Sequence, residues 1–117
     1  MKKLRQWLSL VAFGCATLAM GPVAAQSYPT GPVRIVVPFA AGGGTDTVAR
    51  VVAQVLATKL PHPVVVDNKP GAGGSIGTIA VTQALADGHT LLLGSNGTMV
   101  MNPALYPTLK YQVDRDL

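Results

Sequence analysis

Two glycine-rich segments, residues 38–46 and 67–78, carry the residues of this 117-residue chain that are best suited to binding chemistry. Each follows a short apolar run, at 33–37 and at 64–66. Glycine lets the backbone adopt a positive φ and lets a ligand approach the chain without a Cβ in the way. A helix that starts directly after such a turn adds unpaired N–H groups and the positive end of its dipole. The pattern predicts that both turns bind an anion.

A simpler interpretation is that these glycines only form tight turns between strands and helices. Seven of the eleven glycines after residue 25 lie in the two turns, whereas one or two are enough for turning. This excess favours anion binding. Asp46 complicates the interpretation, because a carboxylate in the first turn of a helix competes with an anionic ligand for the same N–H groups. Its other possible roles are to orient a water or to pair with an ammonium or hydroxyl group of the ligand.

Residues 73–77, Gly-Gly-Ser-Ile-Gly, match the G-x-S-x-G nucleophile elbow, and Asp87 and His89 follow in the order acid, base. An exported serine hydrolase that uses Ser75 is therefore the alternative hypothesis. Two spacings argue against it. An elbow places its serine directly between strand and helix, but seven residues separate Asp67 from Ser75. One residue separates Asp87 from His89, whereas triad residues come from separate loops. On the simpler interpretation, Ser75 is a helix cap.

Nucleotide and metal binding are disfavoured by spacing. Both turns miss the G-x-G-x-x-G dinucleotide fingerprint, because Thr47 and Ile76 stand where the last glycine is needed. The sequence also has no G-x-x-x-x-G-K-[ST] phosphate loop. His62 and His89 are its only histidines, and neither has a second ligand at helical or turn spacing. We therefore expect no cofactor and no metal.

Residues 1–25 have the three parts of a secretory signal peptide: a basic start, an apolar run over 7–20 and a small-residue end, with cleavage predicted after Ala25. This segment holds three of the nine Lys and Arg residues. The remainder has six against five aspartates, so its net charge is +1 rather than +4. Its basic residues are spread along the chain and form no stripe, which argues against nucleic-acid binding.

The segments around the turns predict an α/β domain. Strands are expected at 33–37, 64–67 and 89–93, and their apolar character is typical of a parallel sheet covered on both faces. Helices are expected at about 45–60, with Thr45 as N-cap, and at 75–86, closed by Asp87–Gly88. The order is β-α-β-α-β. The first helix is expected to be amphipathic, and its buried face is expected to consist of Val48, Val51, Val52, Val55 and Leu56.

The strand order 2-1-3 is favoured because order 1-2-3 would leave one apolar face of the sheet uncovered. It makes the first and third strands neighbours, and their loops part to form the crevice where open α/β sheets bind ligands. The first glycine turn and residues 95–98 would flank this crevice, with the second turn alongside. The tail over 99–117 has no strong period. Three strands leave sheet edges open, so we expect a truncated chain with one incomplete domain over 26–117.

Four segments in succession, 28–46, 64–77, 87–94 and 102–106, closely resemble the Bug/TctC family of extracytoplasmic solute receptors of tripartite tricarboxylate transporters. The resemblance covers nearly all of residues 26–117. It implies the partial first lobe of a periplasmic binding protein type II fold and no enzymatic activity. It also implies a periplasmic, monomeric receptor that delivers a small carboxylate to membrane permease subunits.

In that family, backbone N–H groups and waters at the glycine loops of the first lobe hold the ligand's carboxylate. Ser95 and Thr98 at the end of the third strand are weaker candidates. Because the second lobe is not part of the chain, the resemblance implies weak carboxylate binding, or none, by this chain alone. By position, the resemblance assigns ligand binding to Phe39, Ala41, Gly43, Thr45, Asp46, Ala72, Gly73, Gly74, Ser75, Ser95 and Thr98.

Overall fold

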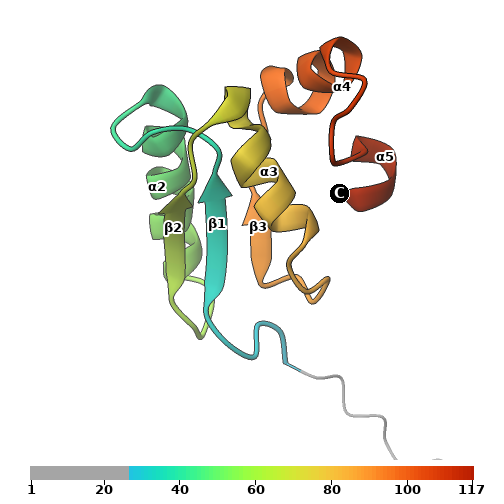
Figure 1. Cartoon of the computed structure of the whole chain (residues 1–117). Coiled ribbons are helices and arrows are strands. Elements are labelled where there is room, and N and C mark those ends of the chain that lie inside the picture. The colour runs from blue at the N-terminus through green and yellow to red at the C-terminus, as the bar shows by residue number, and fades with distance from the viewer. Residues whose placement is uncertain (1–26) are drawn as a thin grey trace, which may run out of the picture.

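The computed structural model describes residues 27–117, which are built around a three-stranded parallel sheet (Figure 1). The strands are β1 (Val33–Val37), β2 (Val64–Asn68) and β3 (Thr90–Leu92), in the order β2-β1-β3. In the register of the sheet, Ile35 of β1 lies between Val66 and Leu91. The predicted α/β class and the strand order 2-1-3 are confirmed.

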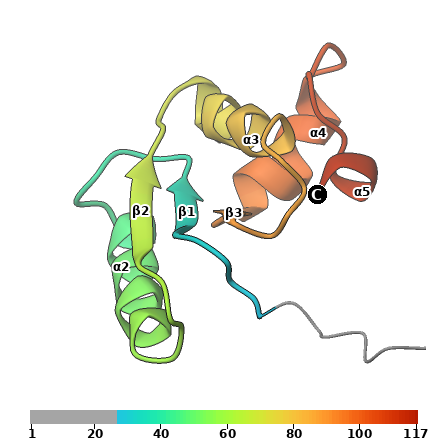
Figure 2. The ribbon, with the colours of Figure 1, turned by 90° about the horizontal axis from the view of Figure 1, so that it is seen from below.

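One helix covers each face of the sheet, as that strand order requires. Helix α2 (Gly44–Ala57) follows β1, and the short η2 (Ala72–Gly74) and helix α3 (Ser75–Thr82) follow β2. Figure 1 shows α2 behind the sheet and α3 in front of it, and the view from below places them on opposite sides (Figure 2). No helix within residues 27–117 has the length and apolar character needed to cross a bilayer.

The segment after β3 forms three short helical elements that the sequence did not indicate. These are η3 (Gly97–Met101), α4 (Asn102–Leu105) and α5 (Val113–Asp116). Each is too short to show a hydrophobic period, so local signals define them. In α4, Pro103 lies in the first turn, where a residue without an N–H costs no hydrogen bond. At α5 the side chain of Asp116 accepts a hydrogen bond from the Gln112 N–H at 2.8 Å.

The core lies between β1 and α2. Ile35 and Val37 pack against Ala49 and Ala53 of the helix, and all four are at most 7% exposed. The small alanines let the helix lie close to the strand. The predicted buried stripe of α2 is therefore wrong: Val48, Val51, Val52 and Val55 are 40–56% exposed, and Leu56 is only half-buried. The prediction was based on the hydrophobicity of the large side chains. In the structure, close packing against the sheet buries the small alanines instead.

Two predicted N-caps and the predicted end of the second helix are also wrong. Gly43 rather than Thr45 is the N-cap of α2, and its carbonyl accepts the Thr47 N–H at 3.0 Å. Gly74 rather than Ser75 is the N-cap of α3. That helix ends at Thr82 instead of residue 86, and Gly88, with φ +79°, forms the turn that leads into β3 instead of closing the helix.

A matched pair of substitutions tests which face of α2 is buried. Ala49→Leu adds three carbons to a site that is 0% exposed, so we expect unfolding free energy to fall by about 2 kcal/mol through overpacking. Val51 is 56% exposed, and Val51→Thr is expected to change the same quantity by less than about 0.5 kcal/mol. Urea unfolding followed by circular dichroism measures both. A larger loss for Val51→Thr than for Ala49→Leu would contradict this packing.

Candidate functional site

The loops that follow β1, β2 and β3 meet at one edge of the sheet, because the carboxyl ends of parallel strands lie together (Figure 1). The three loops come into contact around Gly74. A Cβ built on Gly74 would lie 2.5 Å from Thr98 Cγ2, in the segment after β3, and 3.4 Å from Phe39 Cζ, in the loop after β1. The structure thus brings one predicted site residue from each loop into contact.

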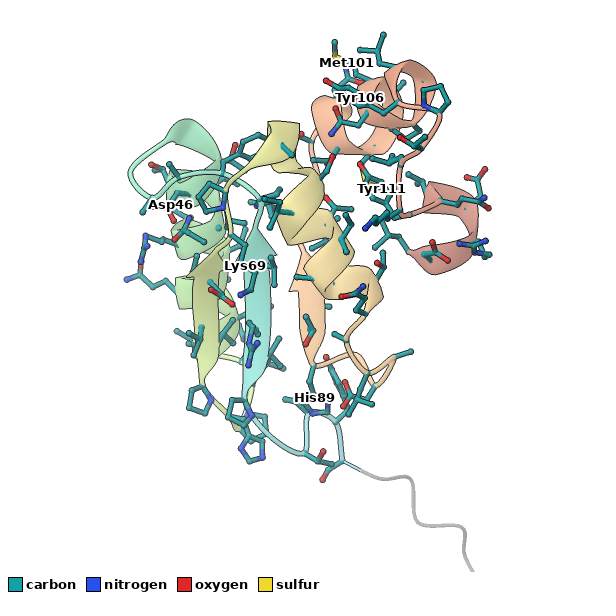
Figure 3. All side chains as sticks on the ribbon, viewed as in Figure 1. Asp46, Lys69, His89, Met101, Tyr106 and Tyr111 are labelled. Atoms are coloured by element: carbon teal, nitrogen blue, oxygen red, sulfur yellow. The ribbon has the colours of Figure 1, made fainter. Side chains whose placement is uncertain are left out.

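Asp46 holds the first loop in shape. Its carboxylate is almost completely buried and accepts three hydrogen bonds: from the Gly42 N–H at 2.8 Å, from Arg50 Nε at 2.9 Å and from Asn68 Nδ2 at 3.0 Å. Asn68 Nδ2 also donates to the carbonyl oxygen of Phe39 at 3.2 Å. The Arg50 hydrogen bond, followed by those of Gly42 and Asn68, lowers the pKa of Asp46 to about 2. The carboxylate therefore faces donors of its own chain (Figure 3).

The start of α2 presents N–H groups at this edge. Thr47 is the first residue whose N–H donates back to the turn, to the carbonyl of Gly43. The N–H groups of Gly44, Thr45 and Asp46 precede it and have no carbonyl one helical turn behind them. Ala41, Gly43 and Gly44 are exposed and Thr45 is half-buried, so this part of the loop is open to a ligand.

The second loop runs through four consecutive residues with positive φ: Gly71 at 128°, Ala72 at 48°, Gly73 at 61° and Gly74 at 90°. Ala72 is the only one of them with a Cβ, and the only non-glycine residue with positive φ between residues 27 and 117. Asn102 supports the loop from α4. Its Nδ2 donates to the Gly73 carbonyl at 3.0 Å and to Ser75 Oγ at 3.1 Å. Sequence reasoning missed Asn102, although its Asn-Pro pair is a signal for a helix start.

Ser95 and Thr98 bind each other rather than standing free. The Ser95 N–H donates to Thr98 Oγ1 at 3.0 Å, and that hydroxyl donates to the Ser95 carbonyl at 3.1 Å. The buried Tyr111 donates its hydroxyl to the Thr98 carbonyl at 2.5 Å and so fixes the segment from the tail (Figure 3). Tyr111 is a second supporting residue that the sequence analysis did not identify.

Accessibility divides the predicted site residues. Asp46, Gly74, Ser75 and Thr98 are buried, and the three side chains among them make hydrogen bonds within the protein. These four residues are therefore placed to hold the loops in shape. The exposed or half-buried members, which a ligand can reach without rearrangement, are Phe39, Ala41, Gly43, Thr45, Ala72, Gly73 and Ser95.

Ser75 and His89 lie at opposite ends of the sheet, so no catalytic triad forms. Ser75 follows β2 at the carboxyl edge, whereas His89 precedes β3 (Figure 3). His89 Nε2 accepts the Thr30 N–H at 3.1 Å, and His89 Nδ1 lies 3.3 Å from Asp87 Oδ1. The part of the chain that the structure describes contains no group of three or more His, Cys, Asp or Glu side chains arranged to hold a metal.

Comparison with known proteins identifies the family. The sequence profile described as "Tripartite tricarboxylate transporter family receptor" matches residues 48–117. Protein BugT of Bordetella pertussis is 44% identical over 112 residues, which cover 94% of this chain and 34% of BugT. A UPF0065 protein of Agrobacterium vitis is 50% identical over 93 residues, covering 80% of this chain and 27% of that protein. The chain thus spans about a third of the length of these curated relatives.

Solved structures of similar sequence share this fold. MatC from Rhodopseudomonas palustris with bound malate is 45% identical, with a TM-score of 0.72 over 76% of this chain and 30% of MatC. An R. palustris protein with adipate is 36% identical, with a TM-score of 0.71 over 75% of this chain and 29% of that one. The matching family is one of solute receptors, not enzymes, which leaves the serine hydrolase hypothesis without support. The profile match, the sequence identities and the shared fold show that the chain belongs to the Bug/TctC family of tripartite tricarboxylate transporter receptors.

Proposed function

We propose that residues 27–117 form one wall of a binding site for a small carboxylate, and that the two glycine loops hold the carboxylate group through backbone N–H groups. The convergence of three loops at Gly74 carries this proposal, because it gathers the open N–H groups of α2 and the left-handed turn of residues 71–74 at one edge. Oriented N–H groups at a helix start or in such a turn favour an anion.

A dicarboxylate is the ligand class that we propose. Two relatives of the same fold have been solved with malate and with adipate, and both ligands are dicarboxylates. Arg50, which follows the first loop in α2, already pairs with Asp46 at 2.9 Å. Recognition at this wall therefore rests on N–H groups and on helix dipoles rather than on a charged side chain, which suits a carboxylate of any chain length.

The remaining proposals concern the whole protein. We propose a periplasmic, monomeric receptor that passes its ligand to the permease subunits of a tripartite transporter; the family description supports the receptor role. The signal peptide proposed for residues 1–25, with cleavage after Ala25, lies outside the described residues. Because the chain spans about a third of its curated relatives, we also propose that residues 26–117 are an incomplete first lobe and that a second wall completes the site.

Amide chemical shifts of the ¹⁵N-labelled chain test the proposal during titration with malate and with adipate at constant ionic strength. We expect the amides of residues 43–46 and 72–75 to shift and to saturate in the millimolar range, since one wall makes half of the contacts. Adipamide, which has the shape of adipate without its charges, is the matched control and should leave these amides unchanged. Unshifted loop amides, or equal shifts with adipamide, would contradict carboxylate binding here. Saturation of these shifts at micromolar ligand would contradict the proposal that the chain forms only one wall of the site.

A further inference from the structure

We infer that Asn102 is a positioning residue for carboxylate binding, which acts by holding the second glycine loop in its left-handed conformation. Its effect on binding rests on the proposed function, whereas its effect on the loop can be measured without ligand. The inference starts from a backbone outlier. Ala72 has φ +48°, a conformation that its Cβ disfavours and that glycine adopts freely. A residue keeps such a conformation when its surroundings impose it, and such outliers cluster at ligand-binding sites.

The carboxamide of Asn102 is placed to impose that conformation. Its Nδ2 donates to the carbonyl of Gly73, directly after Ala72, and to the hydroxyl of Ser75, the first residue of α3. The two bonds tie the end of the turn to the start of the helix. The side chain also lies over Gly73, since a Cβ built there would be 3.5 Å from Asn102 Oδ1. Asn102 is 6% exposed and 29 residues away from Gly73, so the contact is a tertiary one.

Asn102 is itself held rigidly. It is the first residue of α4, and its backbone carbonyl accepts the Tyr106 N–H at 2.9 Å. The preceding η3 is fixed by the hydroxyl of the buried Tyr111, which donates to the carbonyl of Thr98. The tail after β3 therefore acts as a brace for the loop after β2. This gives a function to a segment in which the sequence shows no periodic pattern.

Only a neutral amide suits this position. Both contacts that Asn102 makes are donated by Nδ2, and its acceptors are a carbonyl and a hydroxyl. Aspartate has the same size, but when ionised it has no hydrogen to donate. Its charge would face the Gly73 carbonyl and would repel a bound carboxylate. Alanine removes the donor and the contact with Gly73 together. In either variant Ala72 is expected to relax out of the left-handed region and to turn the N–H groups of the loop away from the ligand.

Binding of malate and adipate to Asn102→Ala and Asn102→Asp provides the test, with Gln54→Ala as the matched control. Gln54 also carries a carboxamide, but it is exposed on α2 and stands outside this network. We expect both Asn102 variants to weaken binding roughly tenfold, the factor that corresponds to the net loss of one hydrogen bond. Shifts at residues 72–75 should disappear, while those at residues 43–46 persist. Wild-type affinity in both Asn102 variants would overturn the inference.

The double variant Asn102→Ala with Ala72→Gly separates positioning from a general loss of stability. Glycine adopts the positive φ without support, so binding should return in the double variant if Asn102 acts on Ala72. A folded double variant that still binds as weakly as Asn102→Ala would overturn the inference.

The backbone chemical shifts of Ala72, which report its φ, give a readout that needs no carboxylate. The left-handed signature should be lost in Asn102→Ala and kept in Gln54→Ala. If wild-type loop amides fail to respond to carboxylates, the proposed function fails, and these shifts still decide whether Asn102 holds the loop. A retained left-handed signature in Asn102→Ala would overturn the inference in that case as well.

Discussion

Replacing Gly77 by alanine is expected to destabilise the protein by about 3 kcal/mol, at the upper end of what overpacking costs. Gly77 lies where α3 packs directly on the backbone of the first two loops. A Cβ at this position would lie 2.8 Å from the carbonyl oxygen of Lys69 and 2.8 Å from Cα of Pro38. Both are backbone atoms, so neither can rotate away as a side chain would. The helix must move off the sheet, and the loops of the proposed carboxylate site must move with it.

Gly44→Ala is the matched control for this prediction. Gly44 is also a helical glycine beside a glycine loop, but a Cβ there would meet nothing within 4 Å and its φ is not in the positive region. The same substitution is therefore expected to stabilise the protein by about 0.5 kcal/mol. Urea unfolding followed by circular dichroism measures both variants. Similar unfolding free energies for Gly77→Ala and Gly44→Ala would show that α3 has room to accept a side chain.

The strand order could be predicted from sequence because it depends on a property that four of the five residues of β1 share. Val33, Ile35, Val36 and Val37 are all buried, and a strand that is apolar on both faces needs a helix on each. The two glycine turns could be predicted for a similar reason, since their residues are adjacent in the chain. Patterns of this kind are local, so no knowledge of packing was needed.

The supporting residues could not be predicted because their partners are distant in sequence. Asn102 contacts Gly73 from 29 residues away, and Tyr111 contacts Thr98 from 13 residues away. Neither stands in a periodic segment. The buried face of α2 was missed for a different reason: hydropathy ranks valine above alanine, but Ala49 and Ala53 are the helix residues that pack against β1, while the valines stay exposed. The sequence pattern therefore identified the two glycine loops, while the packing in the structure identified the residues that hold them.

Asp46→Asn is expected to destabilise the protein at neutral pH and to flatten its acid unfolding profile. The carboxylate accepts hydrogen bonds from Gly42, Arg50 and Asn68. An asparagine has a single acceptor oxygen, so its NH₂ group must face one of these donors, and Arg50 loses the partner of its charge. The first loop then loses the tie to β2 that runs through Asp46 and keeps only the Asn68 bond to the Phe39 carbonyl. We expect its carboxylate-induced amide shifts to weaken while those at residues 72–75 remain.

The sign of the pH effect follows from the pKa of Asp46, which the folded protein lowers from 3.8 to about 2. A carboxyl whose pKa is lower in the folded state stabilises that state when it is ionised. Its contribution is therefore complete above the unfolded pKa and is lost as the pH falls from about 4 to about 2. The Asp46→Asn variant has no such group, so its urea midpoint should fall less steeply over this range.

Asp116→Asn provides the comparison that makes the result specific to Asp46. Its pKa is also lowered, by Arg115 and by the Gln112 N–H, but the pair lies at the surface in α5, and Arg115 is 65% exposed. Exposed pairs contribute little to stability, so this variant should follow the wild-type profile closely. If the acid unfolding profile of Asp46→Asn runs parallel to that of the wild type, Asp46 is not the source of the stability lost between about pH 4 and about pH 2. A steeper fall in wild type than in Asp46→Asn would show that this buried carboxylate, through its hydrogen bonds to Gly42, Arg50 and Asn68, stabilises the folded protein.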